Sequence, residues 1–117
     1  MTKKIHFIGI CGTAMATLAA MLKARGYDVQ GSDHGVYPPM SDFLRREGIR
    51  VFDGYRDTQI TGDLDLVVVG NAISRGNPEL EAVLDRKTRF VSLPEAIREH
   101  FLWASRRSEE HTSELQS

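Results

Sequence analysis

The segment 5-IHFIGICGTAM-15 predicts a short apolar strand, a glycine-bearing turn and the start of a helix. This order leaves unpaired backbone N–H groups and the positive end of a helix dipole at the turn, where a phosphate group is stabilised. Gly9 begins a pattern like G-x-G-x-x-G, in which Cys11 and Ala14 replace the second and third glycines. A second strand ends at Asp33, at roughly the twenty-residue spacing expected for a carboxylate near a ribose. The segment therefore predicts a site for a phosphorylated ligand, with nucleotides as the leading class.

Strand and helix patterns alternate along the rest of the chain. Apolar runs predict strands at 4–8, 29–32, 50–52, 64–70 and 90–91. Helical spacing, with glycines at the ends and prolines in first turns, predicts helices at 13–25, 40–47, 78–84 and 94–102. This alternation predicts an α/β, Rossmann-like domain with a mostly parallel five-stranded sheet flanked by helices. The unbroken apolar run within 64–70 is typical of a strand covered on both faces.

The carboxyl ends of the predicted strands indicate where a ligand binds. In open parallel sheets, ligands lie outside these ends, near the point where the strand order reverses. The loops at 9–13, 32–37, 71–77 and 92–94 all follow predicted strands. We therefore expect the four loops to surround one crevice.

Composition narrows the class of protein. The chain has 117 residues, of which 41% are hydrophobic and 26% are charged, as expected for one globular domain. A net charge of −1 gives no indication of a nucleic-acid or membrane-surface partner, and no apolar run approaches the roughly 20 residues that span a bilayer. The single cysteine, Cys11, fits a reducing cytoplasm. No cluster has metal-ligand spacing, and His6, within a strand, is expected to pack or be exposed rather than bind metal.

The last residues, 107–117, differ from the rest of the chain. They are polar and lack an apolar period. They resemble the in-frame translation of a common sequencing adapter, so we expect an artefactual tail after a gene cut near residue 106. A natural disordered tail is the alternative.

Several loop motifs resemble the N-terminal domain of the Mur ligase family. They are 7–13, 31–33, 36–41, 70–73 and 75–78. The resemblance covers residues 3 to about 104, and the segments Tyr-Pro-Pro-Met-Ser and Arg-Gly-Asn-Pro indicate the family member that adds a tripeptide rather than L-alanine. It implies that residues 1–106 form a UDP-sugar-binding domain, followed in the intact enzyme by an ATPase domain and a C-terminal domain.

The resemblance also implies an activity for the intact enzyme. An ATP-dependent amide ligase would join the carboxylate of UDP-N-acetylmuramate to L-alanyl-γ-D-glutamyl-meso-diaminopimelate in cell-wall peptide recycling. ATP and Mg²⁺ are implied cofactors, but the chain contains no G-x-x-x-x-G-K-[ST] loop to hold them. We therefore expect this fragment to bind UDP-N-acetylmuramate in the cytoplasm without completing the reaction, and the peptide to bind through other domains.

The site residues that the resemblance implies fall on the predicted loops. The loop from Gly9 to Thr13 is expected to hold the diphosphate through its N–H groups, although a tight turn alone also requires glycine. Ser32 and Asp33 would orient the ribose or uracil, or else Asp33 serves the turn. No residue is expected to be catalytic, and no metal ligand is expected. The predicted substrate-binding set is Gly9, Ile10, Cys11, Gly12, Thr13, Ser32, Asp33, Tyr37, Asn71, Ala72, Ile73 and Arg75.

For the remaining members of this set, a purely structural role is the alternative to ligand binding. Asn71, Ala72 and Ile73 would close over the nucleotide, but asparagine also suits left-handed turns. Arg75 would reach the diphosphate or the sugar carboxylate, or else be solvated. Tyr37, on a stiff Pro-Pro loop, would form one wall of the uracil pocket, or else the loop only leads into the next helix.

Two other functions remain open from the residues. A stand-alone Rossmann module that senses NAD or another nucleotide is compatible with Asp33, although Cys11 and segment 37–41 argue against it. A structural or interaction domain would bind neither NAD nor a UDP-sugar.

Overall fold

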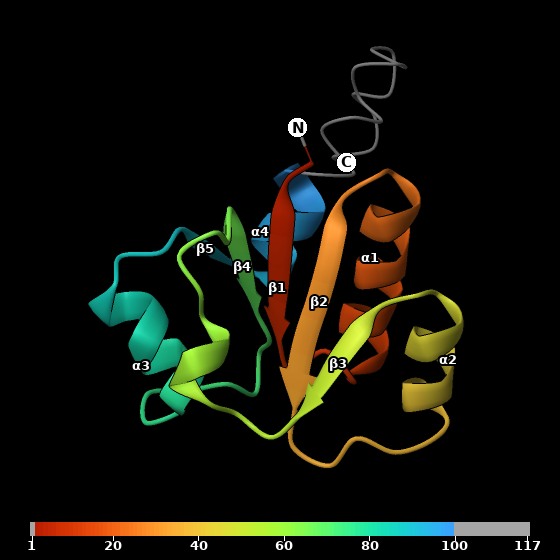
Figure 1. The fold of residues 1–117 in the computed structure, drawn as a ribbon, viewed down its shortest axis with the longest axis horizontal. Helices are drawn as coiled ribbons and strands as arrows, with labels where there is room; N and C mark the ends of the chain where they lie inside the picture. Colours follow the sequence, from red (N-terminus) through yellow and green to blue (C-terminus); the bar gives the residue numbers. More distant parts are fainter. Residues whose placement is uncertain (1, 100–117) are drawn as a thin grey trace, which may run out of the picture.

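The sheet at the centre of the molecule has five strands in the order β3-β2-β1-β4-β5, as shown by a computed structural model that describes residues 2–99 (Figure 1). Every pair of neighbouring strands is parallel. The predicted Rossmann-like α/β fold is therefore confirmed. In chain order the elements are β1 (Lys4–Ile8), α1 (Thr13–Ala24), β2 (Asp28–Asp33), α2 (Met40–Arg46), β3 (Arg50–Asp53), the 3-10 turn η1 (Asp57–Gln59), β4 (Leu66–Val69), α3 (Pro78–Asp85), β5 (Phe90–Ser92) and α4 (Leu93–Ile97).

The predicted element bounds differ from the observed ones by a few residues. The strand predicted at 64–70 is shorter, and the last helix, predicted at 94–102, begins at Leu93 and is helical to Ile97. Residues 100–102 of that helix, the domain boundary at 106 and the tail of residues 107–117 lie outside the described residues.

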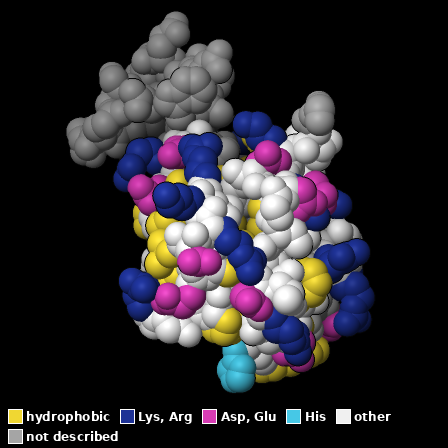
Figure 2. All heavy atoms as spheres, turned by 60° about the vertical axis from the view of Figure 1, so that its left-hand side comes forward, with side chains coloured by type: hydrophobic (Ala, Val, Ile, Leu, Met, Phe, Trp, Pro, Cys, Tyr) yellow, Lys and Arg dark blue, Asp and Glu magenta, His cyan; other side chains and the backbone are white. Residues whose placement is uncertain are grey.

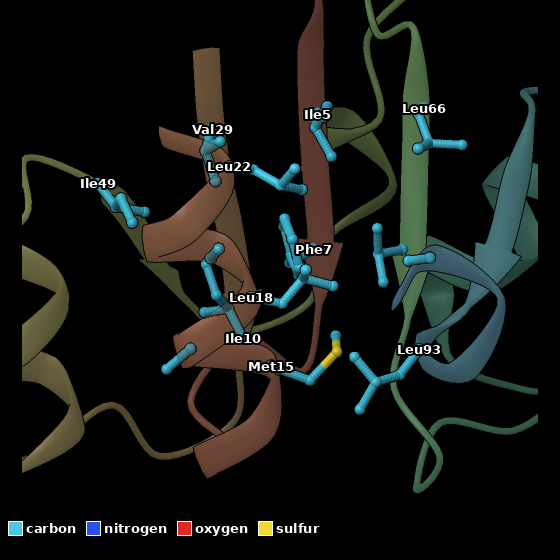
Figure 3. Packing of buried hydrophobic residues seen from close by; sticks show 14 of the residues in the cluster. Ile5, Phe7, Ile10, Met15, Leu18, Leu22, Val29, Ile49, Leu66 and Leu93 are labelled. Carbon is cyan, nitrogen blue, oxygen red and sulfur yellow. The ribbon is translucent and has the colours of Figure 1, made fainter. Parts of the chain in front are cut away.

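Two apolar clusters place the helices on opposite faces of the sheet. Helices α1, α2 and α4 pack on one face, whereas α3 and η1 pack on the other (Figure 1). On the first face, Phe7 of β1 meets Leu18 and Leu22 of α1 (Figure 3). Residues 66–68 of β4 are at most 4% exposed, so this strand is covered on both faces, as its apolar run predicted.

The helix starts differ in how their N–H groups are satisfied. Asn77 caps α3 by accepting hydrogen bonds from Glu79 N at 2.9 Å and Leu80 N at 3.3 Å, and Pro78 opens the helix. Ser92 and Glu95 form a capping box at α4. In contrast, α1 begins after Gly12, and no side chain caps it. The positive end of α1 is therefore open to a ligand.

The surface carries charges of both signs. On the face that Figure 2 shows, Lys and Arg side chains alternate with Asp and Glu side chains. None of the helices within residues 2–99 combines the length and apolar character needed to cross a membrane.

Candidate functional site

A cavity of about 350 Å³ lies at the carboxyl ends of β1 and β4, where the strand order reverses. We call it the β1–β4 cavity. This is the position at which sheets of this class bind ligands. Predicted site residues from three loops line it: Gly9, Gly12, Thr13, Asp33, Asn71, Ala72 and Ile73.

A second cavity, of about 330 Å³, lies beside the first. We call it the Tyr37 cavity, and its lining includes Cys11, Tyr37 and the two prolines that follow. Gly12 and Asp33 line both cavities. The fold therefore brings residues from all of these loops to one composite site. Tyr37 is 68% exposed, so its ring is accessible to a ligand.

The first N–H groups of the glycine loop are bound within the protein. Gly9 N and Ile10 N donate to the Ser32 carbonyl at 2.8 and 3.0 Å. Cys11 N donates to Asp33 Oδ2 at 2.8 Å. These three donors, which were expected to face a diphosphate, serve in the structure to fasten the loop to the end of β2.

Anion-binding capacity at this edge comes instead from the start of α1. The first N–H groups of a helix have no partner within the helix, and no side chain caps this one. Thr13, Ala14 and Met15, the first residues of α1, all line the β1–β4 cavity. The helix dipole adds a partial positive charge there. The geometry thus offers a phosphate site four to six residues further along the chain than Gly9.

The Asp33 carboxylate lies between the two cavities. Oδ2 accepts from Cys11 N, and Oδ1 accepts from His34 N at 2.6 Å and from the Tyr55 hydroxyl at 3.4 Å. A carboxylate there can accept hydrogen bonds from hydroxyl or ring N–H donors of a ligand. Tyr55, which also lines the β1–β4 cavity, was missed by sequence reasoning because it lies in an irregular loop.

Burial, together with the charge of Asp33, raises the pKa values of two neighbouring groups. Burial, followed by the charges of Asp33 and Asp53, raises the pKa of the Cys11 thiol to about 11. Burial and then the Asp33 charge raise the pKa of Tyr55 to about 12. At neutral pH the site therefore presents an uncharged thiol and a hydroxyl donor.

Three predicted residues line neither cavity. Ile10 is fully buried in the core. Ser32 is also fully buried, and its hydroxyl donates to Glu79 at 2.5 Å. Arg75 Nε and Nη2 donate to the Glu81 carboxylate at 2.7 and 3.1 Å, on the surface. The hydrogen bonds from Arg75 and from Gly76 N lower the pKa of Glu81 to about 2.

A buried polar cluster beneath the loops was not predicted. Glu79, on α3, is fully buried, and its Oε1 accepts from His6 Nε2 at 2.7 Å and from Ser32 Oγ at 2.5 Å. Gln30 Nε2 lies 2.9 Å from His6 Nδ1, and donation to that atom places the ring proton on Nε2. Burial raises the pKa of Glu79, but the hydrogen bonds from His6 and Ser32 outweigh it, so the pKa lies below its usual value. Among residues 2–99 no group of three or more His, Cys, Asp and Glu side chains could hold a metal ion.

Comparison with known proteins shows where this architecture recurs. The family model described as "Mur ligase family, catalytic domain" matches residues 4–102. The UDP-N-acetylmuramate–L-alanyl-gamma-D-glutamyl-meso-2,6-diaminoheptandioate ligase of Haemophilus influenzae is 46% identical over 86% of this chain. The ligase of the same name from Escherichia coli is 44% identical over 85% of it. The chain spans 22% of the length of each of these relatives.

A solved structure shares the fold as well as the sequence. The crystal structure of UDP-N-acetylmuramate:L-alanyl-gamma-D-glutamyl-meso-diaminopimelate ligase from Neisseria meningitides superposes with a TM-score of 0.82 at 40% identity. The match covers 87% of this chain and 32% of that chain.

Proposed function

The chain belongs to the Mur ligase family, and on that basis we propose that residues 1–106 are the UDP-N-acetylmuramate-binding domain of a murein peptide ligase. The observation that carries this proposal is the pair of cavities that meet at the uncapped start of α1 and share Asp33. The site thus consists of two cavities with an anion-binding helix start between them. A nucleoside diphosphate-sugar has three matching parts, because its diphosphate joins a nucleoside at one end to a sugar at the other. The ligases named above support the choice of sugar nucleotide.

In the proposed complex the diphosphate lies at the start of α1. The N–H groups of Thr13 to Met15 and the Thr13 hydroxyl donate to it. The uracil lies against Tyr37, and Asp33 accepts a hydrogen bond from the ribose or the base. Residues 71–73, which line the β1–β4 cavity, close over the ligand.

The three predicted residues outside the cavities have less direct roles in the proposal. Ile10 and Ser32 shape the loop from beneath, through packing and through the Ser32 carbonyl. Arg75 remains a proposed contact to the diphosphate or the sugar carboxylate, and it would have to leave Glu81 to make that contact.

For the whole enzyme we propose an ATP-dependent ligase that joins the sugar's carboxylate to the amine of L-alanyl-γ-D-glutamyl-meso-diaminopimelate in the cytoplasm. The contribution of this domain is to hold the carboxylate in position, which lowers the barrier by proximity and orientation. ATP and Mg²⁺ are proposed to bind outside residues 1–117, because these contain no phosphate loop of the G-x-x-x-x-G-K-[ST] type. The peptide is likewise proposed to bind elsewhere in the enzyme.

Calorimetric titration of the 117-residue chain with UDP-N-acetylmuramate tests the proposal. We expect one ligand to bind per chain, UDP alone to bind more weakly, and no hydrolysis of added ATP. Circular dichroism establishes that the protein is folded under the same conditions. Absence of binding heat on folded protein would refute the proposed ligand.

A competition experiment separates the proposal from an NAD-sensing role. NADH fluorescence is recorded with the folded chain, before and after addition of UDP-N-acetylmuramate. We expect no NADH signal at ligand concentrations that saturate the sugar nucleotide site. Tight NADH binding that UDP-N-acetylmuramate fails to displace would favour the NAD-sensing module instead.

A further inference from the structure

We propose that Glu79 is a positioning residue for the ligand site, because its buried carboxylate ties three ligand loops to one point without lining either cavity. This inference rests on the proposed function for the identity of the ligand. The arrangement of the loops in the free chain tests it independently of that ligand.

The first loop is reached through Ser32. Its hydroxyl donates to Glu79 Oε1 at 2.5 Å, while its carbonyl accepts from Gly9 N and Ile10 N. One residue thus connects the carboxylate to the turn that precedes α1. His6 Nε2, 2.7 Å from the same oxygen, holds it from β1.

The second loop is reached through the other carboxylate oxygen. Glu79 Oε2 accepts from Arg56 N at 3.1 Å and from the Gln59 side-chain amide. Arg56 follows Tyr55, whose hydroxyl reaches Asp33 between the two cavities. The carboxylate therefore also fixes the segment that presents Tyr55 to the ligand.

The third loop ends at Glu79 itself. Residues 71–73 line the β1–β4 cavity, and the chain then runs to Asn77, which caps α3 through Glu79 N. Glu79 lies in the first turn of α3, so its side-chain contacts hold the end of this loop against β1 and β2.

A buried carboxylate is costly compared with apolar packing, so stability alone is a weak reason for its presence. Four donors occupy the Glu79 oxygens: His6, Ser32, Arg56 N and Gln59. They come from β1, β2 and the segment after β3, and no apolar side chain would fix these three at once. This supports a role in holding the loops rather than in filling the core.

The test compares Glu79→Ala and Glu79→Gln with Asp85→Asn, a control on the same helix that also removes one negative charge. In Glu79→Gln, the amide oxygen can still accept from Arg56 N and Gln59. Its NH₂ group would then face His6 Nε2 and Ser32 Oγ, so the His6 ring proton moves to Nδ1 and the Gln30 amide turns to accept it. Nitrogen-15 NMR of the His6 ring measures this change of tautomer directly.

Amide NMR of the ligand-free variants reads the loops. We expect Glu79→Ala to change the amide chemical shifts of Gly9, Ile10, Tyr55 and residues 71–73. In Glu79→Gln most of these chemical shifts should stay at their native values. UDP-N-acetylmuramate affinity should fall about tenfold in Glu79→Ala, while Glu79→Gln stays within about threefold of the native chain and Asp85→Asn is unchanged. Thermal melts ensure that affinities are compared on folded protein.

The outcomes separate the two proposals. If Glu79→Ala leaves the loop amide resonances at their native chemical shifts, the positioning role is refuted whatever the ligand. When the alanine variant does not fold, native chemical shifts of the His6 ring nitrogens in Glu79→Gln refute it, because the contact that ties His6 to Glu79 is then absent. Shifts spread evenly to α4 would also refute it, because they indicate general destabilisation. If the loops shift as expected but the native chain binds no UDP-N-acetylmuramate, the positioning role stands and the proposed ligand fails.

Discussion

The Asp33 carboxylate accepts a hydrogen bond from Cys11 N at 2.8 Å, which fastens the end of β2 to the loop between β1 and α1. The same carboxylate lies at the junction of the two cavities. A fixed negative charge therefore stands beside the proposed diphosphate site, and its electrostatic effect on neighbouring groups is measurable.

Neutralising Asp33 is expected to make Cys11 more acidic. Burial and the charges of Asp33 and Asp53 together raise the thiol pKa to about 11, and Asp33→Asn removes one of these charges while keeping an oxygen acceptor for Cys11 N. The pKa should fall yet stay above its ordinary value, because burial, the larger cause, remains. The pH dependence of alkylation by iodoacetamide measures it, since only the thiolate reacts. Asp28→Asn, at the opposite end of β2, is the control, and equal pH profiles for all three proteins would contradict the prediction.

A charge at residue 12 should separate ligand binding from helix stability. A Cβ there would lie 3.7 Å from the Gly9 carbonyl oxygen, in ordinary contact, and the backbone at Gly12 is extended. Gly12→Asp should therefore cap α1 and change the unfolding free energy by only a few tenths of a kcal/mol, while its charge lowers UDP-N-acetylmuramate affinity by at least about tenfold. Gly12→Asn is the uncharged control. Undiminished binding to the aspartate variant would move the diphosphate away from the start of α1.

Gly31 should tolerate no larger residue. A Cβ at this position would lie 2.5 Å from Ile10 Cδ1 and 2.9 Å from the Phe7 carbonyl oxygen. In Gly31→Ala the Ile10 side chain or the backbone at Phe7 must shift, at an expected loss of about 1–3 kcal/mol in the free energy of unfolding. Urea denaturation measures the loss. Gly62→Ala, where a Cβ meets nothing within 4 Å, should be nearly neutral, and equal midpoints for both variants would disprove the close approach.

The Arg75–Glu81 pair should make the stability of the protein depend on pH in the acid range. Hydrogen bonds from Arg75 and Gly76 N lower the pKa of Glu81 to about 2. Because this pKa is depressed on folding, the pair stabilises the protein above the ordinary glutamate pKa, and the contribution disappears as the pH falls towards 2. Arg75→Ala should raise the Glu81 pKa towards its ordinary value, as read by carboxyl-carbon NMR. An unchanged titration in that variant would show that the pair does not form in solution.

The fold was largely predictable because its signals are local. The apolar run before Gly70 predicted a strand buried on both faces, and glycines and prolines marked the helix ends. Strands β3 and β5 each extend one residue beyond their predicted ends, to Asp53 and Ser92, because the ladder pairing continues past the apolar pattern. The loops at the carboxyl ends of the strands were predictable for the same reason, since a parallel sheet brings them to one edge.

What escaped prediction depends on contacts between residues far apart in the chain. Glu79 follows Asn-Pro at a helix start, a pattern typical of an exposed residue that favours the helix dipole. Its partner His6 is 73 residues away, and neither periodicity nor spacing connects them. Likewise, the sequence contains glycine-loop N–H groups but does not reveal that the Ser32 carbonyl has already engaged two of them.

Ser32 couples the stability of the glycine loop to that of α3, because its hydroxyl donates to Glu79 and its carbonyl accepts from the loop. When α3 leaves the sheet, Glu79 releases Ser32, and the bonds to Gly9 N and Ile10 N lose their support. Hydrogen exchange at these two amides should then follow the local unfolding of α3 rather than fraying of the loop alone. A ligand that closes the loop would in turn slow the exchange of helix amides that it never touches.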